Sequence, residues 1–118
     1  MPYDTSVLDQ ALAERHAEWE RRRVDTLATV LTVLQEVLPQ FGVDEAYVFG
    51  SLAQRGRYHA GSDIDVAVQW KGRSDFFDMA AEVSRRLGQD IDILPLEQIH
   101  FADKIRREGI RWTRATTA

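Results

Sequence analysis

The sequence contains no cysteine, which excludes disulfide bonds, thiolate metal sites and thiol nucleophiles. It also lacks a basic surplus, because 15 lysines and arginines stand against 19 acidic residues and give a net charge of −4. Proteins that bind nucleic acids broadly carry the opposite balance. We therefore expect no direct nucleic-acid binding.

No apolar stretch approaches the roughly 20 residues needed to cross a bilayer. The start, Met1-Pro2-Tyr3-Asp4, lacks the basic and apolar segments of a secretory signal. With 44% hydrophobic and 29% charged residues, the composition is typical of a globular chain. We expect a soluble, cytoplasmic protein with a single domain over residues 1–118, made of an N-terminal helical segment at 6–38 and a core that carries the candidate site at 43–113.

A long helix is predicted near the start of the chain, because residues 6–38 contain neither glycine nor proline. Apolar residues recur there at the spacing of a helix with one buried face: Leu27, Val30, Leu31, Leu34, Val37 and Leu38. Arg21-Arg22-Arg23 interrupts a weaker upstream stripe of Val7, Leu8, Ala11, Leu12 and Trp19, and we interpret the run as a solvated helix face. A helix about 50 Å long exceeds what a small domain covers, so part of it should project, kink or pack on another chain.

Three strands and two further helices are predicted beyond residue 43. Residues 46–49 form an apolar run, and residues 63–69 and 90–94 alternate between polar and apolar side chains. Helices are predicted at 74–87 and 96–108, and 110–113 suits a last short strand. This order indicates a mixed α/β or α+β fold class, with a short mixed sheet packed against helices.

Acidic side chains gather on two of these strands. Residues two apart in a strand point to the same face, so Asp63 and Asp65 lie side by side. Such like charges are costly unless a cation lies between them, and carboxylate oxygens suit Mg²⁺. If the strand at 90–94 is a neighbour, it adds a third carboxylate, with Asp92 as the first choice and Asp90 as the alternative. Three carboxylates are sufficient for a two-metal site. Without a metal, the first pair is an exposed strand face with solvated acids.

A glycine-serine turn follows the first strand. Gly50 lets the backbone approach a ligand closely, and Ser51 offers both an N–H and a hydroxyl. A helical turn after them would point free amides at phosphate oxygens. The structural alternatives are an ordinary turn glycine and a helix N-cap. The roles of Arg55 and Arg57, in the loop that follows, stay open.

The motifs that join these segments resemble a known family. Gly50-Ser51, an eleven-residue gap and Asp63-Ile64-Asp65-Val66 are similar to the signature of the polymerase-β-type nucleotidyltransferase superfamily. Ser62 and Ile91-Asp92-Ile93 resemble its smallest members, the minimal nucleotidyltransferase (MNT) domains. The resemblance extends from Val48 to about Trp112. The chain departs from the usual pattern at 52–56, Leu-Ala-Gln-Arg-Gly, where many members have a tighter Ala-Arg-Gly.

This resemblance implies a polymerase-β-like fold and an enzyme that uses Mg²⁺ and ATP. It implies a catalytic and metal-binding set of Asp63, Asp65 and Asp92, and a nucleotide-binding set of Gly50, Ser51 and Ser62. Similar stand-alone modules are antitoxins of HEPN/MNT toxin–antitoxin pairs, and they transfer AMP to a tyrosine hydroxyl of the HEPN-domain toxin. The resemblance therefore implies such a partner and protein AMPylation.

Two alternatives to this function stay open. One is a non-catalytic antitoxin that neutralises its partner by occlusion, and the other is a transferase that acts on a small molecule. The identity of the acceptor, the preferred nucleotide base, the number of nucleotides added and the homo- or hetero-oligomeric state also stay open.

Overall fold

A four-stranded mixed sheet forms the centre of the fold. The computed structural model describes residues 5–71 and 75–114. Its strands are β1 Glu45–Phe49, β2 Asp65–Val68, β3 Asp92–Pro95 and β4 Ile110–Thr113, in the order β3-β2-β1-β4. β1 is antiparallel to β2 and β4, whereas β2 and β3 are parallel. The predicted fold class, a mixed α+β fold with a short mixed sheet, is confirmed.

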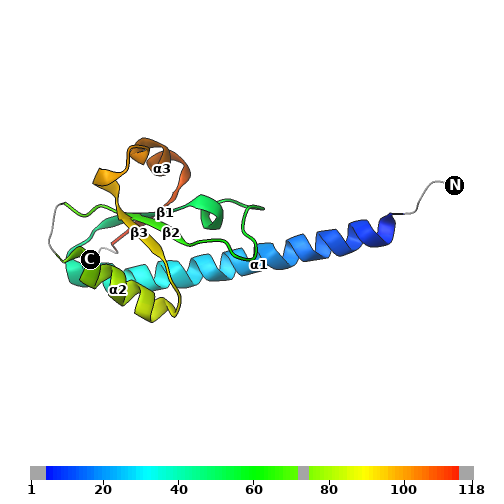
Figure 1. The fold of residues 1–118 in the computed structure, drawn as a ribbon, viewed down its shortest axis with the longest axis horizontal. Coiled ribbons are helices and arrows are strands. Elements are labelled where there is room, and N and C mark those ends of the chain that lie inside the picture. The colour runs from blue at the N-terminus through cyan, green and yellow to red at the C-terminus, as the bar shows by residue number, and fades with distance from the viewer. Residues whose placement is uncertain (1–4, 72–74, 115–118) are drawn as a thin grey trace.

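Helices cover both faces of this sheet. α1 Ser6–Val37 and α2 Phe76–Leu87 lie below it in Figure 1, and the short α3 Ala102–Glu108 lies above it. α2 also connects β2 to β3, because parallel neighbours need a crossover between them. α1 ends in a 3-10 turn, η1 Leu38–Phe41, and Gly42 then takes a φ of 73°. The helix therefore ends within one residue of the predicted boundary at residue 38.

The core has two parts, one on each side of the sheet. The larger part joins α1 and α2 to the sheet and includes Val30, Leu34, Val48, Val66, Met79, Val83 and Trp112. The smaller part lies under α3 and consists of Tyr47, Ala67, Leu96 and Ile105. Because both faces are packed, Ala67 is fully buried although it shares the face of Asp65.

Several predicted boundaries differ from the structure. β2 begins at Asp65, so Asp63 precedes the strand, and β3 begins at Asp92. The helix predicted at 96–108 is divided into η3 Leu96–Gln98 and α3, because Ile99 adopts an extended backbone between them. This break lets Leu96 and Ile105 both reach the sheet. The predicted start of the 74–87 helix, Ser74, lies outside the described residues.

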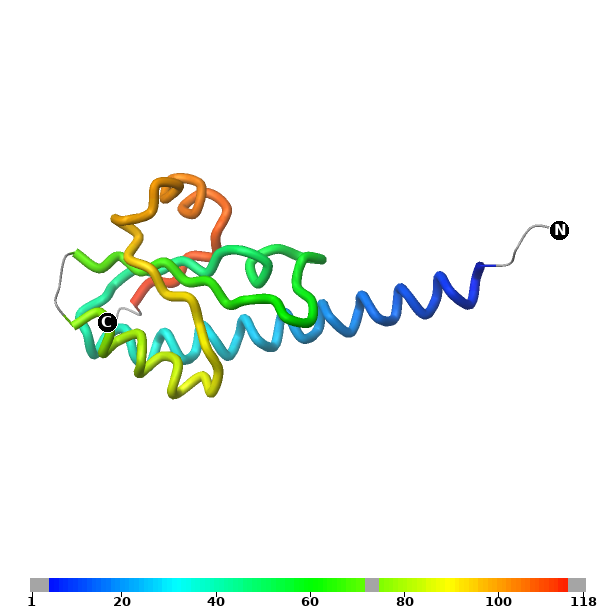
Figure 2. The backbone as a smooth tube through the Cα atoms, viewed as in Figure 1, coloured from blue at the N-terminus to red at the C-terminus, as the bar shows by residue number. Residues whose placement is uncertain are grey.

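The N-terminal half of α1 extends beyond the sheet. The helix is unbroken, and its side chains at residues 6–17 are all exposed. Figure 2 shows this blue segment leaving the rest of the chain, and the long axis measures 67 Å against 30 and 28 Å. Of the expected outcomes, projection is the one observed. None of the described helices has the length and apolar character that crossing a membrane requires.

The interpretation of Arg21-Arg22-Arg23 as a solvated face is wrong for one member. The side chains of Arg21 and Arg22 are 66% and 56% exposed, and both pair with Glu18. Arg23 is only 12% exposed. It lies seven residues before Val30, and therefore on the helix face that turns toward the sheet. A charge run on a helix passes over several faces, and one member points inward here.

Candidate active site

Two aspartates and an aromatic ring form a row across three adjacent strands. Phe49 of β1 pairs with Asp65 of β2, and Asp65 pairs with Asp92 of β3. Directly paired residues point to the same face of a sheet, which here is the face covered in part by α3. The row lies at the end of β1, where the glycine-serine turn begins. The two strands predicted to be neighbours are therefore adjacent, with Asp65 beside Asp92, whereas Asp63 lies before β2 and outside this row.

The charges of this row act on one another. Burial raises the pKa of the Asp65 carboxyl, and the neighbouring charges of Asp92 and Asp63 raise it further. Asp92 also lies within hydrogen-bonding reach of Asp65. The backbone N–H of Asp92 donates to the carbonyl of Ile64, the residue between Asp63 and Asp65, over 2.8 Å. This bond holds the start of β3 next to the start of β2. The fold thus holds Asp65 against Asp92, and near enough to the charge of Asp63 to be repelled by it, at an electrostatic cost.

Gly50 lies directly against this cluster. Its φ is +74°, and a Cβ at this position would overlap Asp65 Oδ2 and lie 3.4 Å from Asp65 Cγ. Only glycine fits such a combination without strain. The 3-10 turn η2 Gly50–Ala53 follows at once, with the Gln54 N–H donating to the Ser51 carbonyl over 3.2 Å. The helical turn expected after the glycine-serine pair is therefore present, as a 3-10 turn.

Ser62 has a local structural role. Its hydroxyl accepts the His59 N–H over 2.9 Å, and its own N–H donates to the His59 carbonyl over 3.0 Å. These bonds close the loop just before Asp63. Asp90 is exposed and lies before β3 begins, without a pairing to Asp65. Binding of the nucleotide by Ser62 stays a prediction.

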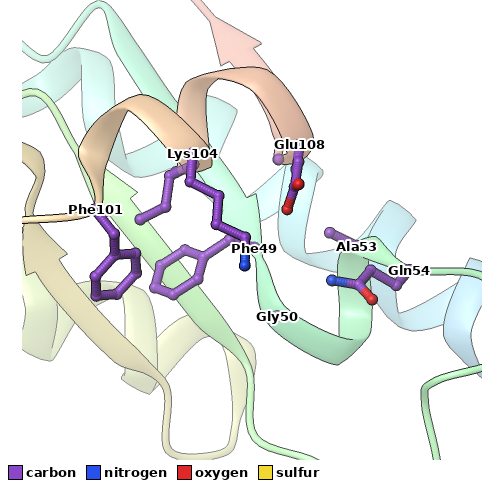
Figure 3. A pocket seen from close by; sticks show the side chains of 9 residues that line it. Phe49, Gly50, Ala53, Gln54, Phe101, Lys104 and Glu108 are labelled. Atoms are coloured by element: carbon purple, nitrogen blue, oxygen red, sulfur yellow. The ribbon is translucent and has the colours of Figure 1, made fainter.

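A cavity of about 170 Å³ opens beside the glycine-serine turn. It lies between the end of β1, η2 and α3, and is lined by Phe49, Gly50, Ala53, Gln54, Phe101, Lys104, Ile105, Glu108 and Gly109. The rings of Phe49 and Phe101 meet edge to face at 6.3 Å. Figure 3 shows Lys104 and Glu108 reaching from α3 toward this opening. The sequence gives no indication of these α3 residues, because no local pattern shows that α3 packs beside the turn.

The donor set suits a divalent cation. Within residues 5–71 and 75–114, no three acidic or histidine side chains form a ready-made metal cluster. Mg²⁺, however, uses one or two carboxylates and completes its shell with water and substrate phosphates. Asp65, whose charge is disfavoured by its two acidic neighbours, would be relieved by such an ion. The residues therefore fit the ion, with Asp63, Asp65 and Asp92 as its candidate ligands.

The family model described as "Polymerase beta, Nucleotidyltransferase" matches residues 33–113, more than half of the chain. This chain belongs to that nucleotidyltransferase family. The matched segment begins inside α1 and ends in β4, so it contains the row, the turn and the cavity of the candidate site. The projecting half of α1 lies outside the part that matches the family.

Two solved structures are similar to this family member. One is provisionally described as a minimal nucleotidyltransferase; it is 25% identical, with a TM-score of 0.55, over 80% of this chain and 93% of that one. The other is provisionally described as a nucleotidyltransferase from Sulfolobus solfataricus, also 25% identical, with a TM-score of 0.45 over 78% and 87%. The first supports the nucleotidyltransferase fold. No protein of curated function matches the sequence significantly.

Proposed function

We propose that this chain transfers AMP from ATP to a tyrosine hydroxyl of a HEPN-type toxin and so acts as its antitoxin. The observation that carries the proposal is the direct pairing of Asp65 with Asp92, with Gly50 against the Asp65 carboxylate. Membership of the nucleotidyltransferase family supports the reaction type. The choice of AMP and of a HEPN partner rests on the resemblance to MNT domains.

The reaction assigns a task to each of the three aspartates and to the glycine-serine turn. The acceptor oxygen bonds to the α-phosphorus of ATP, the bond from that phosphorus to the bridging oxygen breaks, and pyrophosphate leaves. Asp63 and Asp65 would hold Mg²⁺, which would neutralise charge on the phosphate oxygens. The amides of the turn at Gly50 and Ser51 bind the triphosphate. Asp92 takes the hydroxyl proton.

The openness of the site favours a large acceptor. Asp63 and Asp92 are both exposed, and β3, which carries Asp92, is an outer strand of the sheet. A small acceptor binds well only when a pocket covers most of its surface. A protein acceptor brings its own surface to the site and needs no such enclosure. We therefore favour a protein substrate over a small molecule.

A labelling experiment tests the proposal. The chain is incubated with ATP labelled at the α-phosphate, Mg²⁺ and the product of the neighbouring gene, the proposed HEPN-type partner. We expect label on the partner with the wild type, and at least a hundredfold less with Asp63→Asn or Asp65→Asn, because these remove metal ligands. Asp90→Asn is the matched control, since this exposed acid neither pairs with Asp65 nor contributes to its raised pKa. Label that persists in both the Asp63→Asn and the Asp65→Asn variants, or is absent with the wild type, contradicts the proposal.

Neutralisation by occlusion is the second candidate. It is favoured by the projecting part of α1, whose exposed side chains include the apolar Val7, Leu8 and Leu12. Cells that express the toxin together with the double variant Asp63→Asn, Asp65→Asn separate the two functions. A catalytic antitoxin fails to protect these cells, whereas an occluding one still protects them.

A further inference from the structure

The loop after β1 is attached to α1 by a pair of charged residues outside the candidate active site. Arg23 donates through Nη1 to the Leu52 carbonyl over 3.1 Å. Glu20 accepts the Gly56 N–H over 3.2 Å, and Arg23 Nη2 donates to Glu20 Oε1 over 2.6 Å. We propose that Arg23 and Glu20 are positioning residues that hold the glycine-serine turn in the shape that binds a triphosphate. This inference rests on the proposed function.

The pair differs from the other ion pairs on α1. The side chains of Arg23 and Glu20 are 12% and 26% exposed, whereas that of Arg21, on another face of the helix, is 66% exposed. Arg23 Nε also donates to both Glu20 oxygens, at 3.0 and 3.1 Å, so the two groups meet as a fork. Charge-assisted bonds that are shielded from water are stronger and less screened by salt than exposed ones. The pair can therefore hold a backbone segment in place.

Both contacts of the pair lie just after the glycine-serine turn. Leu52 directly follows Ser51, and its side chain is fully buried in the core that packs on α1, the helix that also carries Arg23. Gly56 lies farther along the loop, beyond η2. A third contact extends the attachment, because the rings of Trp19 and Tyr58 meet edge to face at 6.2 Å. The loop is thus connected to α1 at residues 52, 56 and 58.

The attachment offsets the conformational freedom that several glycines give to the loop. Glycines at 50, 56 and 61 all have positive φ, and a Cβ at Gly56 or Gly61 would meet nothing within 4 Å. Glycine has the largest conformational freedom to lose when a loop is ordered. A loop ordered before the ligand arrives spares that entropy at binding. Arg23 and Glu20 supply the order, although neither is placed to touch the substrate.

Two measurements on the full chain test the inference. Hydrogen–deuterium exchange reports the order of residues 50–58, and a transfer assay with Mg²⁺ and ATP reports KM and kcat. For Arg23→Ala we expect several-fold faster exchange in this segment. KM for ATP should rise about tenfold, the effect of losing one charge-assisted hydrogen bond, with kcat changed less than about twofold. A shift mainly in KM is expected because the turn binds the triphosphate equally in the ground and transition states.

The controls separate this role from a general loss of structure. Arg21→Ala removes an exposed arginine from the same run and should leave both measurements at the wild-type values. Arg23→Lys keeps a donor for the Leu52 carbonyl, so its KM for ATP should return most of the way to the wild-type value. It also replaces Arg23→Ala if that variant does not fold. Exchange no faster in Arg23→Ala than in Arg21→Ala overturns the inference, and so does faster exchange with an unchanged KM. A wild type without transfer activity refutes the proposed function instead, and exchange alone then decides whether the pair holds the loop.

Discussion

Replacing Gly50 with alanine tests the closest contact of the candidate site. The added Cβ would overlap Asp65 Oδ2, and residue 50 has a φ of +74°. A left-handed backbone costs a residue with a Cβ about 1–2 kcal/mol. Displacing a packed group adds about 1–3 kcal/mol. We therefore expect Gly50→Ala to lower the free energy of unfolding by about 2–5 kcal/mol.

Gly88→Ala is the matched control for the backbone cost. Gly88 caps α2 with a φ of +76°, and a Cβ there would meet nothing within 4 Å. This variant should lose only the conformational part, about 1–2 kcal/mol. Urea unfolding followed by tryptophan fluorescence gives both free energies. The difference between the two variants measures the contact between residue 50 and Asp65.

A double-mutant cycle with Asp65→Ala then identifies the cause. Truncating the carboxylate makes room for the new Cβ, so the cost of alanine at position 50 should fall to the value found at Gly88. The coupling energy between the two sites should be about 1–3 kcal/mol. A coupling energy near zero, or a Gly50→Ala variant as stable as Gly88→Ala, would refute the described contact between Gly50 and the Asp65 carboxylate.

Three further outcomes follow from the same structure. Asp65→Asn should raise the melting temperature of the metal-free protein at pH 7. Burial, and then the charges of Asp92 and Asp63, raise the pKa of the Asp65 carboxyl. The wild type therefore loses stability as the pH rises through this raised pKa, whereas the asparagine variant does not. The gain should shrink as the pH falls toward the ordinary value of 3.8, and an equal gain in melts at both pH values would contradict the reasoning. Added Mg²⁺ should raise the melting temperature of the wild type more than that of Asp65→Asn, with EDTA as the reference in a fluorimetric melt. Deletion of residues 1–17 should change the melting temperature by less than about 2 °C, since the side chains at 6–17 are exposed; a larger loss in a circular-dichroism melt would show that they stabilise the fold.

Local patterns predicted most of the elements but few of their ends. The stripe from Leu27 to Leu38 and the alternation near Asp65 are strong signals, because each repeats over several turns or residues. Ala67 breaks the alternation, since α3 buries the face that the pattern assigns to solvent. Whether α3 docks there depends on contacts between segments far apart in the chain. No local period contains that information.

The candidate site, too, could be predicted only in part from the sequence. The chemistry of Asp63, Asp65 and Gly50 is visible in the sequence, but the direct pairing of Asp65 with Asp92 depends on the order and register of the strands. Arg23 was misread because its partner, the Leu52 carbonyl, is 29 residues away and lies in a loop. The cavity residues Phe101 and Lys104 were missed because a helix break at Ile99, invisible in the apolar pattern, sets the direction of α3.

The strand order β3-β2-β1-β4 places the third acid on a margin of the sheet. A peripheral carboxylate can be approached along the plane of the strands as well as from above. Under the proposed function, a folded protein could present a side chain to it sideways, without unfolding and without a lid that must first open. Its selection would then depend on the fit between the two docked surfaces rather than on a pocket.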